Sequence, residues 1–109
     1  AFHSEDDTYT DLAYATGNDL AQSTAYWNIV SGCGSDADQC LVGTVWLFAP
    51  SSTIFVKQVY TEIQNYTYSN DAGNQFTGGY FNTTSAINAI DFKMSSGNMD
   101  GEIKMYGLL

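Results

Sequence analysis

Positive charge is scarce in this sequence. The chain has no arginine, and its three lysines, Lys57, Lys93 and Lys104, stand against twelve acidic residues, for a net charge of −9. Proteins that bind nucleic acid need Lys and Arg to displace counterions from phosphates, and bidentate phosphate recognition relies on the guanidinium of Arg. We therefore expect no nucleic-acid partner, and the same charge disfavours binding to an anionic membrane surface.

Long hydrophobic runs are also missing. No stretch approaches the roughly 18 apolar residues from which a transmembrane helix is built, so we expect no membrane insertion. The opening letters AFHS are typical of the tail of a strand rather than of a natural N-terminus. We therefore expect further sequence upstream of Ala1.

Cysteine is rare, and its spacing limits what it can do. Cys33 and Cys40 enclose six residues, GSDADQ. Two thiols at this spacing lack the second pair of ligands that tetrahedral zinc needs. A disulfide that closes a short polar loop is the preferred interpretation, with free thiols as the alternative. A disulfide would indicate an oxidising setting, such as the outside of a cell or virion.

The residues that are abundant favour strands over helices. The chain has eight Tyr, six Phe and two Trp, whereas helix formers are thin. We rank helix below strand for residues 18–30, because their apolar positions fit the 3.6-residue period poorly. Short strand-like stretches separated by Gly, Ser, Asn and Asp clusters predict one domain over 1–109, an all-β, antiparallel, jelly-roll-like β-sandwich. The expected strands are 24–30, 41–48, 53–63, 78–82, 87–94 and 102–108.

The end of the chain is expected to form a buried hairpin. Alternation places Ile90, Phe92 and Met94 on one face of one strand, and Ile103 and Met105 on one face of the next. These strands are predicted to pair around the loop 95–101, with Ile103 and Met105 in the core. Two further breaks are expected, a chain reversal at Pro50 and a loop tip at 69–75.

Residues that could carry catalysis or bind a metal do not form a recognisable set. His3 is the only histidine and has no partner for a nucleophile. Glu5, Asp6, Asp7 and Asp11 could supply the paired carboxylates of a hydrolase, although clustered acids are more often a solvated surface. Calcium could use oxygen ligands from 4–11, 34–39 or 69–74, none of which has the EF-hand pattern. We assign no catalytic residue, no cofactor and no metal.

Polar and aromatic side chains are interspersed in the second half of the chain. Aromatic rings beside amides suit the recognition of sugars, and the same residue types are enriched in protein interfaces and in sandwich layers. The residues concerned are Tyr60, Tyr66, Tyr68 and Tyr80. Two Asn-x-Thr triplets, at 65–67 and 82–84, would matter only in a glycosylating host.

The C-terminal half resembles a β-sandwich domain of tailed-bacteriophage virion proteins. The motifs that carry the resemblance are the strand and Pro turn at 43–50, the aromatic-Asn segment at 80–82, the strand at 87–94 and the terminal hairpin with Ser-Ser-Gly-Asn at 95–98, Gly101 and Tyr-Gly-Leu at 106–108. The resemblance implies a virion structural or adhesion role and supplies no catalytic residue.

We therefore expect a non-enzymatic virion protein outside the cell, a tail, fibre or capsid-surface module for host attachment or particle stabilisation. Its expected partners are copies of itself, other virion proteins and, for an adhesin, a glycan of the host surface, because exposed sheet edges need partners or covers. A secreted carbohydrate-binding module is the alternative. A carboxylate hydrolase using Glu5, Asp6 or Asp11 is a third interpretation.

Overall fold

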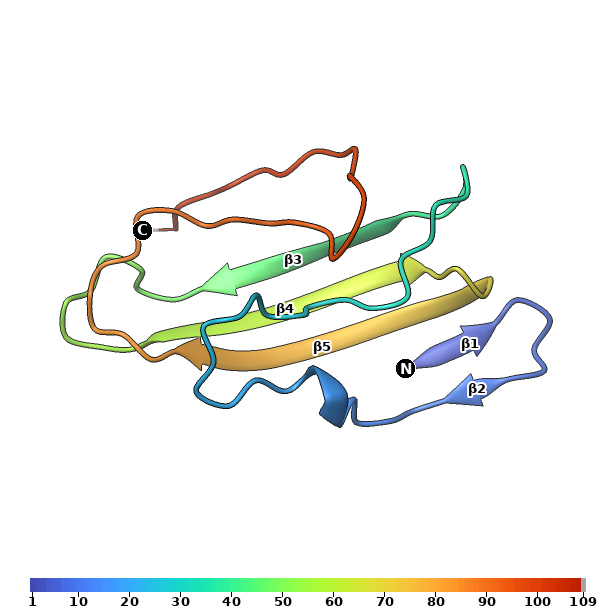
Figure 1. Cartoon of the computed structure of the whole chain (residues 1–109), viewed down its shortest axis with the longest axis horizontal. Helices are drawn as coiled ribbons and strands as arrows, with labels where there is room; N and C mark the ends of the chain where they lie inside the picture. The colour runs from blue at the N-terminus through green and yellow to red at the C-terminus, as the bar shows by residue number, and fades with distance from the viewer. Residues whose placement is uncertain (109) are drawn as a thin grey trace.

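The computed structural model describes residues 1–108 and contains one antiparallel sheet. The five strands lie in the order β2-β1-β5-β4-β3 across the sheet (Figure 1). One 3-10 turn, η1 (Thr16–Asn18), is the helical element among the described residues, so the predicted all-β class is confirmed. Leu109, the last residue of the expected domain, lies outside the described residues. In chain order the strands are β1 (Phe2–Ser4), β2 (Thr10–Asp11), β3 (Leu41–Leu47), β4 (Lys57–Tyr66) and β5 (Asp71–Phe81).

Three long strands form the body of the sheet. β4 is the middle strand of these three and pairs with β5 along its whole length and with β3 over residues 59–65. β3 confirms the strand expected at 41–48 to within one residue. It ends before Ala49, which has a φ of 47°, and the turn that follows includes Pro50, as expected of a residue without an amide hydrogen.

The turn between β4 and β5 is tighter than the sequence indicates. Thr67 Oγ1 accepts hydrogen bonds from the backbone N–H of Ser69 at 3.2 Å and of Asp71 at 3.3 Å. Asn70 adopts a φ of 62°, which Asn tolerates better than most residues. The loop expected at 69–75 was therefore wrong beyond residue 70, and β5 includes most of the expected strand 78–82.

The strand expected at 53–63 begins four residues later. The hydroxyl of Ser52 accepts the N–H of Ile54 at 3.1 Å and of Phe55 at 3.0 Å, which holds this segment in a turn. The strand then begins at Lys57 and continues to Tyr66, three residues beyond the expected end.

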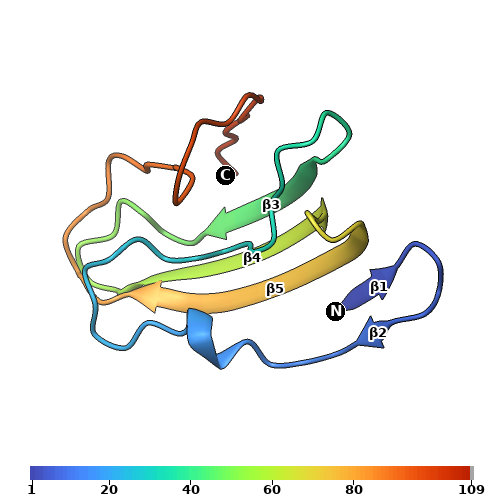
Figure 2. The same ribbon diagram turned by 45° about the vertical axis from the view of Figure 1, so that its right-hand side comes forward.

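The two faces of the sheet have different surroundings. Alternate residues of β4 are buried, and we call their side of the sheet the covered face. The segment 27–34 crosses this face in front of β4 and β5 (Figures 1 and 2). There Ser31 Oγ donates to Gln75 Oε1 at 3.2 Å, and the Trp27 ring lies against Gly79, where an added Cβ would approach Cη2 to 3.0 Å. The other side, the open face, carries the exposed residues of β4.

Three expected strands were wrong. Residues 24–30, 87–94 and 102–108 form no ladder, so the described structure has one sheet and not the two of a sandwich. From residue 82 onward the chain runs past β3, turns, and returns (Figures 1 and 2). No backbone hydrogen bond joins these two arms among residues 1–108.

The buried terminal hairpin was also wrong. Ile103 is 59% exposed and Met105 76% exposed, whereas Phe92 and Met94 are half-buried. Period-two alternation shows which residues would share a face, but an extended segment becomes a strand only when another strand satisfies its backbone groups. The arms lack such a partner within the described chain.

Candidate functional site

The open face carries a row of aromatic side chains across the three long strands. Trp46 of β3 and Tyr60 of β4 are paired residues, and their ring centroids lie 5.1 Å apart. Phe76 of β5 continues the row, with its centroid 6.4 Å from that of Tyr60. Phe76 is 62% exposed, so the row ends in solvent.

A glycine interrupts the aromatic row. Gly78 faces Tyr60 across the ladder and lies two residues from both Phe76 and Tyr80, so all four share the open face. A Cβ added at Gly78 would meet no atom within 4 Å. The surface at Gly78 is therefore open, and the flat face of a sugar ring or an apolar side chain could lie there beside the aromatic side chains.

Sequence reasoning found part of this face. Tyr60, Tyr66 and Tyr80 lie on it, since each pairs with a residue of the same face. Tyr68 does not, because it follows the end of β4. Trp46 and Phe76 were missed, although the alternation of 41–48 and a correct start for β5 would have placed both beside Tyr60.

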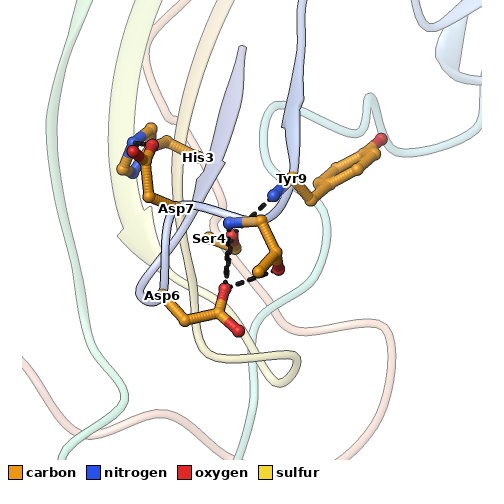
Figure 3. A network of polar contacts seen from close by, with 6 residues as sticks. His3, Ser4, Asp6, Asp7 and Tyr9 are labelled. Atoms are coloured by element: carbon orange, nitrogen blue, oxygen red, sulfur yellow. Dashed lines mark hydrogen bonds and ion pairs between the residues drawn. The ribbon is translucent and has the colours of Figure 1, made fainter.

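The acidic residues near the N-terminus form a turn between β1 and β2 (Figure 3). Asp6 Oδ1 accepts three hydrogen bonds, from Thr8 Oγ1 at 2.6 Å, Thr8 N at 3.1 Å and Ser4 Oγ at 2.9 Å. The Ser4 hydroxyl accepts the N–H of Tyr9 at 2.9 Å. Asp6 thus stabilises the chain reversal, as Asp side chains commonly do in turns.

These hydrogen bonds lower the pKa of Asp6 below its ordinary value of 3.8. The side-chain hydrogen bond from Thr8 is the largest cause, followed by the Thr8 backbone and the Ser4 hydroxyl. A general acid of a hydrolase needs a raised pKa instead. The hydrogen bonds of Asp6 suit a structural carboxylate.

The other candidate acids point to different partners. Asp7 Oδ1 lies 3.0 Å from Nε2 of His3, at an exposed position on the other side of the turn from the Asp6 carboxylate (Figure 3). Glu5 Oε2 accepts a hydrogen bond from the Tyr66 hydroxyl at 3.2 Å. Asp11 lies in β2, paired with Phe2. The structure therefore does not bring Glu5, Asp6 and Asp11 together around one site.

Cys33 and Cys40 lie at neighbouring positions beside the end of β4, and both are free thiols. The backbone of Cys33 forms an isolated β-bridge with Thr67, and the carbonyl of Cys40 accepts the N–H of Tyr66 at 2.9 Å. Because successive residues of β4 point to opposite faces, the two thiols line different hollows. Burial raises the pKa of the Cys33 thiol. The disulfide stays a prediction, and closing it would require the loop 33–40 to turn one of the two side chains.

The covered face contains polar residues that sequence reasoning missed. Lys57 is fully buried, and its Nζ donates to the carbonyls of Phe55 at 2.7 Å and Thr83 at 3.3 Å. Thr61 Oγ1 and Asn65 Oδ1 are buried without a hydrogen-bond partner among the described residues. Strand alternation could have predicted their burial, because they share a face with Val59 and Ile63.

No family model, curated protein or solved structure matches this chain. Within residues 1–108, no three His, Cys, Asp or Glu side chains gather closely enough to hold a metal ion. That same part of the chain has no helix of the length and apolar character that crossing a membrane requires.

Proposed function

We propose that this chain is a non-enzymatic structural subunit of a tailed-phage virion. It serves as a tail, fibre or capsid-surface module on the extracellular particle, and it works as a homo-oligomer in contact with other virion proteins. The observation that carries the assembling role is the large surface that the chain leaves exposed.

This surface exceeds that of a compact monomer. The described chain exposes 8608 Å², whereas a monomer of this mass exposes about 5,900 Å². Its radius of gyration is 15.6 Å, against about 13 Å for a compact domain of this length. An excess of about 2,700 Å² per chain, or about 5,400 Å² for two chains, lies at the upper end of the total area that obligate subunits bury against each other.

The exposed surface is rich in large apolar side chains. Val59 and Ile63 are the buried hydrophobic residues among 1–108, whereas Leu12 is 86% exposed and Leu108 is 90% exposed. Monomeric soluble proteins rarely expose contiguous apolar patches of more than a few hundred Å², and larger patches are typical of interfaces. Contact with other subunits would remove these side chains from water.

The predicted β-sandwich would form only on assembly of the subunits. The segments 24–30 and 87–94 already contact each other through side chains, because the Tyr26 hydroxyl donates to Asp91 and Lys93 Nζ lies 4.1 Å from the centre of the Tyr26 ring. Each is half-buried in part. Assembly would supply the backbone partners from which a second sheet forms.

The virion setting depends on the sequence resemblance. Of its motifs, 43–50 forms most of β3 and the following turn, and 80–82 lies at the end of β5. The strand at 87–94 and the terminal hairpin, which is the most specific motif, contain no paired strands and add no structural support. The exposed surface supports assembly, and the resemblance supports a virion as its place.

The aromatic row favours one alternative, a secreted carbohydrate-binding module. Tyr60 and Phe76 could stack on a sugar over the open surface at Gly78, while the neighbouring Gln64 and Asn74 offer amides for its hydroxyls. Binding of the monomer to a glycan array, lost in Phe76→Ala, would favour this alternative over a virion subunit.

Sedimentation of the purified chain and antibody labelling of purified phage particles test the proposal together. We expect a discrete oligomer at micromolar concentration and labelling on the outside of the particle. A folded monomer at all concentrations would contradict the assembling role. Oligomers without labelling of the particle would contradict the virion setting alone.

A further inference from the structure

β3 is the long free edge of the sheet. It pairs with β4 on one side, and no backbone hydrogen bond from residues 1–108 reaches its other side. The opposite edge is β2, which has two residues. On that side, the outer edge of β5 beyond residue 74 also lacks a backbone partner among residues 1–108, but β3 is the edge that is free along its whole length.

The register shows which backbone groups of β3 are free. The carbonyl of Cys40 accepts the N–H of Tyr66 at 2.9 Å, and the N–H of Phe48 donates to the carbonyl of Gln58 at 3.0 Å. Residues that bond to the same neighbour alternate in an antiparallel pair. The even-numbered residues of β3 therefore bond to β4, and the outward groups belong to Leu41, Gly43, Val45 and Leu47.

The residues and pairing of this strand show none of the features that keep strand edges apart, although the arms that follow residue 82 run past it (Figures 1 and 2). Natural proteins protect edges with charged side chains, proline, bulges or very short strands. β3 reads LVGTVWL over seven residues, with no charge and no proline, and it pairs with β4 without a bulge. Its first residues, including Val42 at 69% exposure, are open to solvent.

We infer that two copies of this chain pair antiparallel through β3, around a two-fold axis at Thr44. This inference rests on the homo-oligomer of the proposed function and names the surface that forms it. In this register all seven residues are paired, so Gly43 meets Val45 of the partner subunit and Leu41 meets Leu47 of the partner subunit. The outward backbone groups of both copies then bond to each other.

The side chains of this register are compatible. Thr44 lies opposite Thr44 of the partner subunit, and Trp46 opposite Val42 of the partner subunit, which are favourable cross-strand pairs. The aromatic rows of the two copies join across the seam into one open face. The nearest open-face charge in the ladder is Glu62, which lies one strand away from the edge.

The surface beside β3 also favours a second copy of this chain as the partner. The arms that follow residue 82 project past β3, on the side where the second copy would lie (Figures 1 and 2). They carry apolar side chains that are more than half exposed, among them Ile103, Met105, Tyr106 and Leu108. A second copy on this edge would cover part of them, which a ligand confined to the open face would not do.

Disulfide crosslinking tests the register. In a full-length chain with Cys33→Ser and Cys40→Ser, Thr44→Cys places one thiol at the two-fold axis, in a pair of the closer, non-hydrogen-bonded type. Mild oxidation with copper phenanthroline converts two thiols into one disulfide. The oxidant takes up two electrons, and two protons are released. We expect most of Thr44→Cys to become a covalent dimer, whereas the matched control Gln64→Cys, exposed on β4, stays mostly uncrosslinked.

Three further variants separate this inference from the proposed function. Val45→Pro removes an outward N–H and leaves the bonds to β4, so we expect at least a tenfold weaker dimer with an unchanged circular dichroism spectrum. Thr44→Lys and Thr44→Glu should each dissociate alone and associate when mixed. If the native chain is oligomeric but none of these variants changes it, the β3 seam is overturned and the proposed function stands. A native monomer overturns both.

Discussion

Asp6 is the clearest case of a residue whose role depends on its surroundings. Its position in an acidic run is compatible with catalysis, calcium binding or a solvated surface. The structure places its carboxylate where it accepts hydrogen bonds from Ser4 and Thr8, which lower its pKa below 3.8. A group with a lowered folded-state pKa stabilises the fold above its unfolded pKa, and this stabilisation is lost as pH falls through the folded value.

Substitution of Asp6 should therefore change the response of stability to acid. We expect Asp6→Ala to lower the free energy of unfolding at neutral pH and to flatten its decline below about pH 4. Asp6→Asn retains an oxygen acceptor but cannot titrate, so it should preserve more of the neutral-pH stability and still flatten the acid decline. Urea unfolding from pH 7 to pH 3 measures both effects. An unchanged acid decline in both variants would show that Asp6 does not contribute to it.

At the scale of elements, sequence reasoning succeeded where local chemistry sets the boundary. The apolar, β-branched composition of 41–48 and the following Pro50 were sufficient for β3. The strands expected at 24–30, 87–94 and 102–108 also contain aromatic and β-branched residues but form no ladder. Strand propensity describes how well a side chain fits a pleated surface and does not supply the neighbouring strand.

Gly43 offers a test of how closely β3 and β4 pack. A Cβ at this residue would lie 2.4 Å from the carbonyl oxygen of Glu62 and 2.6 Å from Cδ1 of Ile63. We expect Gly43→Ala to reduce the free energy of unfolding by about 1–3 kcal/mol, because the backbone must shift. Gly78→Ala is the matched control, since its Cβ would meet open space, and it should leave stability unchanged or slightly higher. Equal losses in both variants, measured by urea unfolding, would contradict the close packing.

For the whole molecule, charge and exposed surface act in opposite directions. Each copy carries a net charge of −9, which repels other copies. The exposed apolar area and the β3 edge favour association, and neither depends on charge. The strength of assembly should therefore depend on how well salt screens the repulsion.

We accordingly expect association to strengthen as sodium chloride increases from low to physiological concentration. The dissociation constant, measured by sedimentation, should fall over this range because screening reduces repulsion between the acidic copies. Thr44→Lys mixed with Thr44→Glu provides the contrast, since an attractive pair at the seam should make the dependence on salt weaker. Association that weakens with salt in the native chain would indicate an interface held by ion pairs instead.

The sequence by itself determined the all-β class, the course of β3, the strand character of residues 2–4 and the shortage of positive charge. Each follows from side-chain types within a few neighbouring residues, or from composition. Only the tertiary structure decided that one sheet forms, that Asp6 stabilises a turn, and that Trp46, Tyr60 and Phe76 share an open face. These depend on which segments pair and in what register, and strand pairing joins residues far apart in the chain through backbone groups that every sequence shares.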